Sequence, residues 1–358
     1  MYPNDADDVT IVTGGAGFIG SEVVRQLLAR PSGIIVTVDN LSYAGNVATM
    51  GSFLNHPRHI FENADICDSS AMGRIFSVYQ PRSLIHLAAE SHVDRSIDDP
   101  SSFVTTNVVG TVTLLEAARH QLRPDLHALF RFVHVSTDEV FGSLGAEGAF
   151  NESTRYDPSS PYSASKAASD HMARAWHRTF GIPTIVTNCS NNYGPYQFPE
   201  KFVPLIISKC LKEEMIPIYG SGTNIRDWLY VGDHAAALLQ VLERGRVGST
   251  YNIGGNAELK NIEVAHIICE MLDIERPRSN GVSYKELIKF VVDRPGHDHR
   301  YAIDARKIRG ELNWEPRFTL EEGMSETVRW YLANQEWVSK VTERSYDGHR
   351  LGRAERAQ

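Results

Sequence analysis

The sequence has few of the features that mark secreted, membrane-spanning or metal-binding proteins. Its four cysteines are widely spaced over 358 residues, and none forms a Cys-x-x-Cys pair. We therefore expect neither a disulfide framework nor a metal site. No apolar run approaches the roughly 18 residues that span a bilayer. The first eight residues are polar and acidic, unlike the basic start of a signal peptide. These absences predict a cytoplasmic protein without a membrane partner.

Positive charge is also scarce, with 36 Lys and Arg residues against 44 Asp and Glu residues and a net charge of −8. Because affinity for a nucleic-acid backbone needs clustered Lys and Arg, we expect no nucleic-acid partner. A negative net charge does not exclude a local basic pocket that holds one phosphorylated small molecule. Hydrophobic residues make up 42% of the chain, which suffices for a well-filled core. The length fits two or three domains, or one large α/β domain with a lobe attached.

In the first half of the chain, short β-branched runs alternate with longer segments of helical period. The helical pattern is clearest at 18–30, 102–121 and 162–180. This alternation predicts βαβ units and a Rossmann-type, doubly wound parallel sheet with helices on both faces. The predicted strands are Val9–Thr13, Ile34–Val38, His59–Glu62, Ser83–Leu87, Phe130–Ser136 and Thr184–Thr187.

After about residue 190 the pattern loosens and predicts a smaller α/β lobe at the C-terminal edge of the sheet. We expect a first domain over 1–190 with later segments returning to it, a second domain mainly over 191–341, and a solvated tail over 342–358. The elements predicted for the second lobe are strands Ile216–Tyr219, Thr250–Ile253 and Phe290–Val292, and helices 204–213, 232–243, 262–272 and 320–334.

A glycine-rich segment follows the first predicted strand directly and opens a helix. Gly14, Gly17 and Gly20 stand three residues apart. The first glycine permits a tight turn, the second lets the backbone approach a pyrophosphate, and the third allows close helix–strand packing. The N–H groups at the helix start suit phosphate oxygens. In this context the segment predicts a dinucleotide site.

An acidic residue at the end of the second predicted strand indicates which dinucleotide binds. Asp39 stands 19 residues after Gly20, where a carboxylate can hydrogen-bond a ribose hydroxyl. An acid without a following arginine would repel the 2′-phosphate of NADP, so the position favours NAD. Asp65 and Ile66 close the third strand, where we expect them to flank the adenine.

Tyr162 and Lys166 are four residues apart on one face of the predicted helix 162–180. Such a pair is common by chance, but here its helix belongs to a nucleotide-binding sheet. A lysine ammonium can lower the pKa of a phenol from about 10, and tyrosinate then becomes a usable base near neutral pH. We therefore expect the pair to be catalytic.

Two adjacent carboxyls follow the predicted strand that ends at Ser136. Thr137, Asp138 and Glu139 stand at the carboxyl end of that strand, where residues of open α/β sheets face the ligand crevice. The three residues by themselves fit a helix or turn cap equally well. Beside a Tyr/Lys pair and a dinucleotide turn, a general acid and a general base become the better interpretation, because two carboxyls in different environments can divide these roles.

Together these segments resemble the extended short-chain dehydrogenase/reductases, and within them the dTDP-glucose 4,6-dehydratase family of NAD-dependent epimerases and dehydratases. The resemblance covers nearly the whole chain, and its specific part is the Asp138-Glu139 pair. Sugar-nucleotide epimerases of the same superfamily usually carry small or hydroxyl residues at these two positions. The resemblance implies a lyase that uses a tightly bound NAD, regenerated each turnover, and takes dTDP-glucose as substrate.

The resemblance also implies a role for each catalytic residue. Tyr162, with Lys166 and Thr137, removes the proton of the sugar 4-hydroxyl while hydride passes from C4 to NAD. Glu139 then removes the C5 proton, Asp138 protonates the departing C6 hydroxyl, and hydride returns to C6. The product is a 4-keto-6-deoxy sugar.

Binding residues carry over from the same resemblance. The implied cofactor contacts are Gly14, Gly17, Phe18, Ile19, Gly20, Asp39, Asn40, Leu41, Ser42, Asp65, Ile66, Leu87, Ala88, Ala89, Ser91, Thr106, Tyr162, Lys166 and Asn192. The implied substrate contacts are Ser91, Thr137, Asn191, Lys201, Phe202, Pro217, Ile218, Tyr219, Arg226, Asn261, Arg294 and His297. Lys201, Arg226 and Arg294 suit a diphosphate because they can make charge-assisted hydrogen bonds to its oxygens.

Three other functions stay open at this stage. UDP-glucose could replace dTDP-glucose as the substrate. A nucleotide-sugar 4-epimerase would share NAD and the Tyr/Lys pair, but it needs no acid/base pair at 138–139. A catalytically silent NAD-sensing protein would need no tyrosinate. By family analogy we expect a homodimer in which helices 102–121 and 162–180 pack across a two-fold axis.

Overall fold

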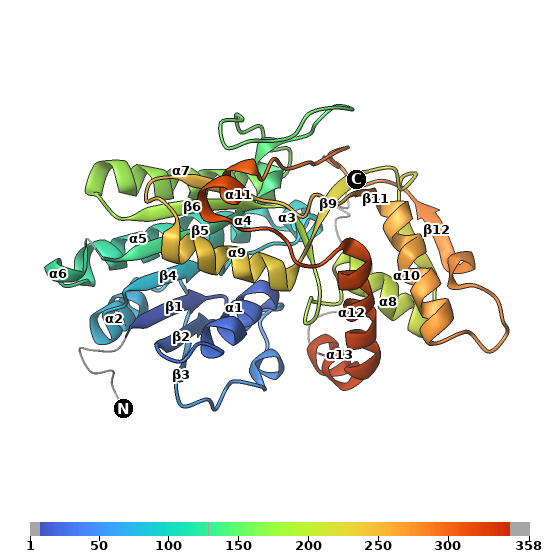
Figure 1. The fold of residues 1–358 in the computed structure, drawn as a ribbon, viewed down its shortest axis with the longest axis horizontal. Helices are drawn as coiled ribbons and strands as arrows, with labels where there is room; N and C mark the ends of the chain where they lie inside the picture. The colour runs from blue at the N-terminus through green and yellow to red at the C-terminus, as the bar shows by residue number, and fades with distance from the viewer. Residues whose placement is uncertain (1–7, 128, 344–358) are drawn as a thin grey trace, which may run out of the picture.

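The chain forms a large doubly wound layer and a smaller lobe beside it in a computed structural model, which describes residues 8–127 and 129–343 (Figure 1). The large sheet has seven parallel strands in the order β10-β6-β5-β4-β1-β2-β3. Their bounds are β1 Val9–Thr13, β2 Ile34–Asp39, β3 His59–Asn63, β4 Ser83–His86, β5 Arg131–Thr137, β6 Thr184–Cys189 and β10 Thr250–Ile253. The predicted Rossmann-type sheet is confirmed.

Helices cover both faces of this sheet, which explains why its strands are almost continuously apolar. The helices α1 and α9 pack against each other on one face, and α2, α5 and α7 lie on the other. Their bounds are α1 Phe18–Leu28, α2 Ser69–Tyr79, α5 Gly110–Gln121, α7 Pro161–Phe180 and α9 Val231–Arg244, with the short helices α3 Val93–Asp98, α4 Pro100–Val104, α6 Pro124–His127 and α11 Arg306–Leu312 at the edges.

The order of the strands reverses between β1 and β4, and this point locates the site. Strand β1 pairs with β2 on one side and with β4 on the other. Ligands of open α/β sheets bind outside the carboxyl ends of the strands at such a switch point. The glycine-rich turn after β1, the segment after β4 and the segment after β5 all meet there.

The second lobe has its own apolar core, which lies between short sheets and helices. Strands β7 Asn191–Tyr193, β9 Ile225–Tyr230 and β11 Glu258–Lys260 form one small sheet, and β8 Ile216–Tyr219 pairs with β12 Ile288–Val291. Its helices are α8 Phe202–Leu211, α10 Asn261–Glu275, α12 Leu320–Ala333 and α13 Gln335–Thr342.

Some predicted elements differ from the observed ones. Segment Thr250–Ile253, placed with the small lobe by its position in the chain, is β10 and extends the large sheet beside β6, because its buried apolar residues complete the core around α9 and α11. The predicted helix 102–121 begins earlier, as α4, and contains a π-helical turn at Thr105–Val109 before α5. The domain bounds remain a prediction. Of the predicted tail 342–358, Thr342 is the last residue of α13, and residues 344–358 lie outside the described part of the chain.

Candidate active site

The glycine-rich turn folds as its spacing predicts. Gly14 has a left-handed backbone with φ of +71°, and a Cβ there would lie 2.7 Å from the backbone nitrogen of Ala88. Its N–H donates to the Val38 carbonyl at 2.8 Å. A Cβ on Gly20 would overlap the Gly14 carbonyl oxygen. Only glycine fits both positions, so the start of α1 can lie close against the sheet and present its backbone to a ligand.

A cavity of about 290 Å³ opens at this turn and extends to the end of β5. Asp39 lies on its wall at the end of β2 and is buried. One carboxylate oxygen accepts a hydrogen bond from the Ala16 N–H at 3.0 Å, and the other accepts from Leu41 at 2.9 Å. These backbone donors hold the carboxylate at the strand end, where a ribose hydroxyl can reach it.

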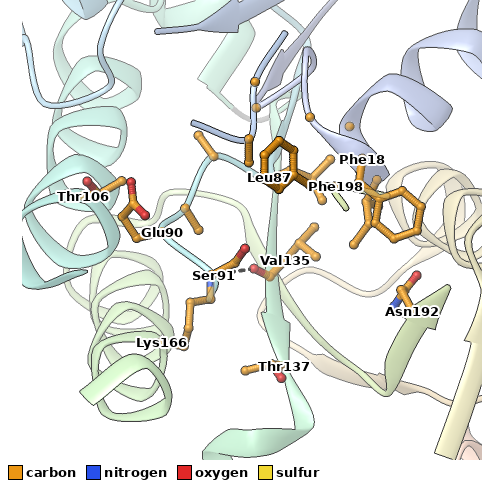
Figure 2. A pocket seen from close by; sticks show the side chains of 18 of the residues that line it. Phe18, Leu87, Glu90, Ser91, Thr106, Val135, Thr137, Lys166, Asn192 and Phe198 are labelled. Carbon is orange, nitrogen blue, oxygen red and sulfur yellow. Dashed lines mark hydrogen bonds between the residues drawn. The ribbon is translucent and has the colours of Figure 1, made fainter. Parts of the chain in front are cut away.

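The Tyr/Lys pair lies at the start of α7. Pro161 occupies the first helical turn, and the side chains of Ser160 and Ser163 form a reciprocal capping box. The Lys166 ammonium donates to the Val135 carbonyl at 2.8 Å, as the dashed line in Figure 2 shows. Tyr162 packs edge-on against Phe103 with ring centroids 6.2 Å apart. The cap and these contacts aim both side chains into the cavity.

The electrostatics of Tyr162 differ from the prediction. Burial raises the pKa of Tyr162 well above 10, and the charge of Glu139 raises it further, while a hydrogen bond with Thr137 lowers it. Lys166 is buried as well, and its ammonium donates a hydrogen bond to the Val135 carbonyl. The net shift of the Tyr162 pKa is therefore upward, opposite to the direction expected from Lys166. The catalytic role of the pair stays a prediction.

The two adjacent carboxyls occupy different environments at the end of β5. Asp138 is 1% exposed, and burial together with the charges of Glu139 and Asp227 raises its pKa well above the ordinary value. Burial also raises the pKa of Glu139, but the charges of Arg294, Arg226 and Lys201 oppose this shift. Two acidic groups therefore favour the protonated form of Asp138, whereas three cations favour the ionised form of Glu139. This difference suits an acid beside a base.

Three cations come from the second lobe toward Glu139. Lys201 donates to the Ser91 carbonyl at 2.7 Å. Arg294 forms a 3.0 Å ion pair with Asp94, and its buried Nε atom has no partner among the described residues. The Arg226 guanidinium lies 4.2 Å from the centre of the Tyr301 ring and is hydrogen-bonded to backbone carbonyls. These positions leave a basic region beside the carboxyls.

The structure brings most of the predicted residues to one cavity. Those that line it are Gly14, Gly17, Phe18, Ile19, Gly20, Asp39, Asn40, Ser42, Ile66, Leu87, Ala88, Ala89, Ser91, Thr106, Thr137, Asp138, Glu139, Tyr162, Lys166, Asn191, Asn192 and Lys201. Figure 2 shows how several of these side chains surround the space.

Ten predicted contacts do not line this cavity: Leu41, Asp65, Phe202, Pro217, Ile218, Tyr219, Arg226, Asn261, Arg294 and His297. Asp65 accepts a hydrogen bond from Asn40, which does line it. The Ile218 side chain is buried in the core of the second lobe. Tyr219 donates to Asp94, the partner of Arg294. The ligand roles of all these residues remain predictions.

Sequence reasoning missed several acidic residues near the site. Asp94 anchors both Arg294 and Tyr219. Asp227 lies on β9, and its charge acts on Asp138, while burial raises its own pKa to about 6. Glu90 lines the cavity, and burial raises its pKa. All three lie in segments that carry the family resemblance, 87–96 and 225–231, but the sequence analysis gave them no role.

Comparisons with known proteins agree with this geometry. The family model described as GDP-mannose 4,6 dehydratase matches residues 11–327. A dTDP-glucose 4,6-dehydratase of Xanthomonas campestris pv. campestris is 54% identical over 346 residues, covering 96% of this chain and 98% of the relative. One of Shigella flexneri is 55% identical, covering 94% and 96%.

A solved structure shows the same likeness in three dimensions. The dTDP-glucose 4,6-dehydratase of Streptomyces venezuelae, crystallised with NAD and TYD bound, is 43% identical, with a TM-score of 0.86 over 93% of this chain and 99% of that one. The described residues include no helix long and apolar enough to cross a membrane. With its glycine turn, Tyr/Lys pair and adjacent carboxyls in one cavity, the chain belongs to the GDP-mannose 4,6 dehydratase family, among the dTDP-glucose 4,6-dehydratases.

Proposed function

We propose that this protein is a dTDP-glucose 4,6-dehydratase, an NAD-dependent lyase that converts dTDP-glucose to dTDP-4-keto-6-deoxyglucose and water. The observation that carries the proposal is the Asp138-Glu139 pair, which shares one cavity with Tyr162 and Lys166. Relatives at 54–55% identity over nearly the full length bear the same activity in their names.

The residues present fit NAD. Gly14 and Gly20 leave a cradle that a Cβ would fill, Gly17 begins the helix that faces it, and Asp39 holds a carboxylate at the end of β2. The glycine-rich turn and the helix start would hold the pyrophosphate, and Asp39 would hold a ribose. When bound, NAD supplies a hydride acceptor at C4 of the sugar and a hydride donor at C6.

Tyr162 is the base for the sugar 4-hydroxyl. Its phenol hydrogen-bonds Thr137, which lies at the end of β5 in the same cavity. Burial keeps the phenol protonated in the protein alone, so it becomes a base only when positive charge joins it in the cavity. Lys166 contributes one such charge from its place at the Val135 carbonyl.

Asp138 and Glu139 divide the elimination of water. Oxidation at C4 makes the C5 proton acidic, and Glu139 removes it, because nearby cations oppose its protonation. Burial and the charges of Glu139 and Asp227 favour the protonated form of Asp138, which delivers its proton to the departing C6 hydroxyl. Glu139 then returns its proton to C5 as the hydride returns to C6, and the proton that Tyr162 took from the 4-hydroxyl restores the acid form of Asp138 for the next turnover.

The direct test is to incubate the purified protein with dTDP-glucose and weigh the product. Loss of one water supports dehydration, and an unchanged mass contradicts it. Parallel incubations with UDP-, CDP- and GDP-hexoses determine the base preference; turnover of UDP-glucose in place of dTDP-glucose would replace the substrate in the proposal. An altered sugar of unchanged mass indicates a 4-epimerase. Protein that carries NAD but converts none of these substrates would be the silent NAD-binding protein.

We also propose that the protein is a homodimer that pairs through α5 and α7. Val104 and Val109 support this, because they are 53% and 49% exposed on the helical run that leads into α5, and α5 packs against α7. Val109→Asp should shift the molar mass in light scattering from dimer to monomer. Ile274→Asp, at a position 81% exposed on α10, is the matched control. A monomeric wild type contradicts this proposal.

The cytoplasm is the proposed location. All four cysteines are free thiols, and three of them are buried. Free thiols are typical of a reducing compartment. Fractionation of the source cells, with the protein detected by antibody, tests this location.

A further inference from the structure

Lys166 is a buried cation that has no acidic group in contact. Its side chain is 4% exposed, and its ammonium donates to the Val135 carbonyl. Among the residues that the structure describes, no carboxylate oxygen lies within 4.0 Å of this ammonium. A buried charge without a counter-charge is strongly destabilising. A counter-charge slightly farther away is therefore expected.

Asp170 lies one helical turn beyond Lys166 on α7 and is fully buried. One carboxylate oxygen is 3.0 Å from His134 Nε2. The other accepts hydrogen bonds from the Tyr156 hydroxyl at 2.7 Å and from Asn188 Nδ2 at 3.3 Å. Partners from β5, β6 and the segment before α7 therefore fix this carboxylate in place.

The contacts of Asp170 keep it ionised. Burial by itself raises the pKa of Asp170, but the contact with His134, the charge of Lys166 and the hydrogen bond of Tyr156 outweigh burial and hold the pKa below its usual range. The Tyr156 hydroxyl also accepts from Arg174 at 2.7 Å, which places a second cation at the far end of this network.

The other titratable groups around Lys166 are neutral. Burial raises the pKa of the Cys189 thiol on β6. Burial lowers the pKa values of His134 on β5 and of His86 on β4, whose rings lie 5.3 Å apart. The negative charges that act on Lys166 come from Asp170 and Cys189. Because the thiol stays protonated, Asp170 supplies the charge.

We propose that Asp170 is a positioning residue for the active site, whose carboxylate, fixed by Tyr156, Asn188 and His134, is the counter-charge that keeps the Lys166 ammonium in place beneath the cavity. The inference rests on the proposed function only in that Lys166 assists Tyr162. Asp170 does not line the cavity, and we assign its effect to the charge that it places near Lys166.

Asp170→Asn removes the charge and keeps the shape. Without the carboxylate Lys166 is less basic, so the basic limb of the kcat–pH profile with dTDP-glucose should move about one unit toward lower pH. We expect kcat to fall about tenfold, with KM nearly unchanged. Asp233→Asn, which alters another buried carboxylate on α9, is the matched control and should leave the profile unmoved. A folded Asp170→Asn protein with an unmoved profile overturns the proposal.

A double-mutant cycle tests the interaction of Asp170 with Lys166 without an activity assay. Thermal unfolding is compared for wild type, Asp170→Asn, Lys166→Met and the double variant. If Asp170 balances Lys166, the double variant should be more stable than the sum of the single losses. Additive losses overturn the proposal, even if Asp170→Asn folds poorly on its own. A wild type without dehydratase activity would contradict the proposed function, while the cycle would still decide this inference.

Discussion

Asp138→Asn tests the assignment of the general acid. The side chain is 1% exposed, and its Oδ2 atom has no hydrogen-bond partner among the described residues. Asparagine has nearly the same shape but no acidic proton. We expect elimination of water to slow about 10²- to 10⁴-fold, the usual contribution of a positioned general acid. That is about 3–5 kcal/mol on the barrier. Oxidation at C4 does not need Asp138, so reduced cofactor should accumulate.

The assay mixes the NAD-loaded variant with dTDP-glucose and follows the near-ultraviolet absorbance of the reduced nicotinamide. Wild type should show a small transient signal, and the variant should show a large lasting one. Product formation at the wild-type rate would refute the role of Asp138. Oxidation without any lasting reduced-cofactor signal would refute it as well.

Stability measurements separate loss of chemistry from loss of fold. Burial, Glu139 and Asp227 raise the pKa of Asp138 in the folded state. Below about pH 4 the carboxyl is protonated in both the folded and the unfolded protein, so it does not change the free energy of unfolding. As pH rises, the unfolded chain releases this proton while the folded protein retains it, so wild type loses stability. The melting temperature of Asp138→Asn should match that of wild type near pH 4 and equal or exceed it at neutral pH.

The remaining predictions concern the base, the dinucleotide turn and the substrate lobe. Glu139→Gln should slow exchange of the C5 proton with solvent deuterium, measured by mass spectrometry; unchanged exchange removes Glu139 as the base. Gly20→Ala, whose Cβ would overlap the Gly14 carbonyl oxygen, should abolish co-purification of NAD. The matched control Gly73→Ala meets nothing closer than 3.9 Å and should stabilise α2 by about 0.5–1 kcal/mol. Arg294→Gln should raise the KM for dTDP-glucose about tenfold or more; an unchanged KM contradicts its role in binding.

Local patterns were enough to predict six of the seven strands of the large sheet, whereas β10 was expected in the small lobe. The predicted strands are short β-branched runs, and the glycine spacing at 14–20 dictates a turn that only glycine can make. The Tyr162/Lys166 pair was recognisable because a separation of four residues places two side chains on one helix face. The small strands β7, β9 and β11 were not predicted. They are three to six residues long, and pairing with distant segments rather than local pattern stabilises them.

By itself, the sequence determined the order of the layers and the glycine-rich turn, and it singled out the candidate catalytic groups, because these depend on residues close together in the chain. Only the tertiary structure decided the state of those groups. Burial, which depends on every neighbour, raises the pKa of Tyr162 where a local pairing with Lys166 suggested the opposite. The fold also places Asp170 near Lys166, on the side away from the cavity, and it brings Arg294 from far along the chain close enough for its charge to act on Glu139. The state of an ionisable group depends on its distance in space from other charges and on its desolvation. Neither quantity can be read from spacing along the chain.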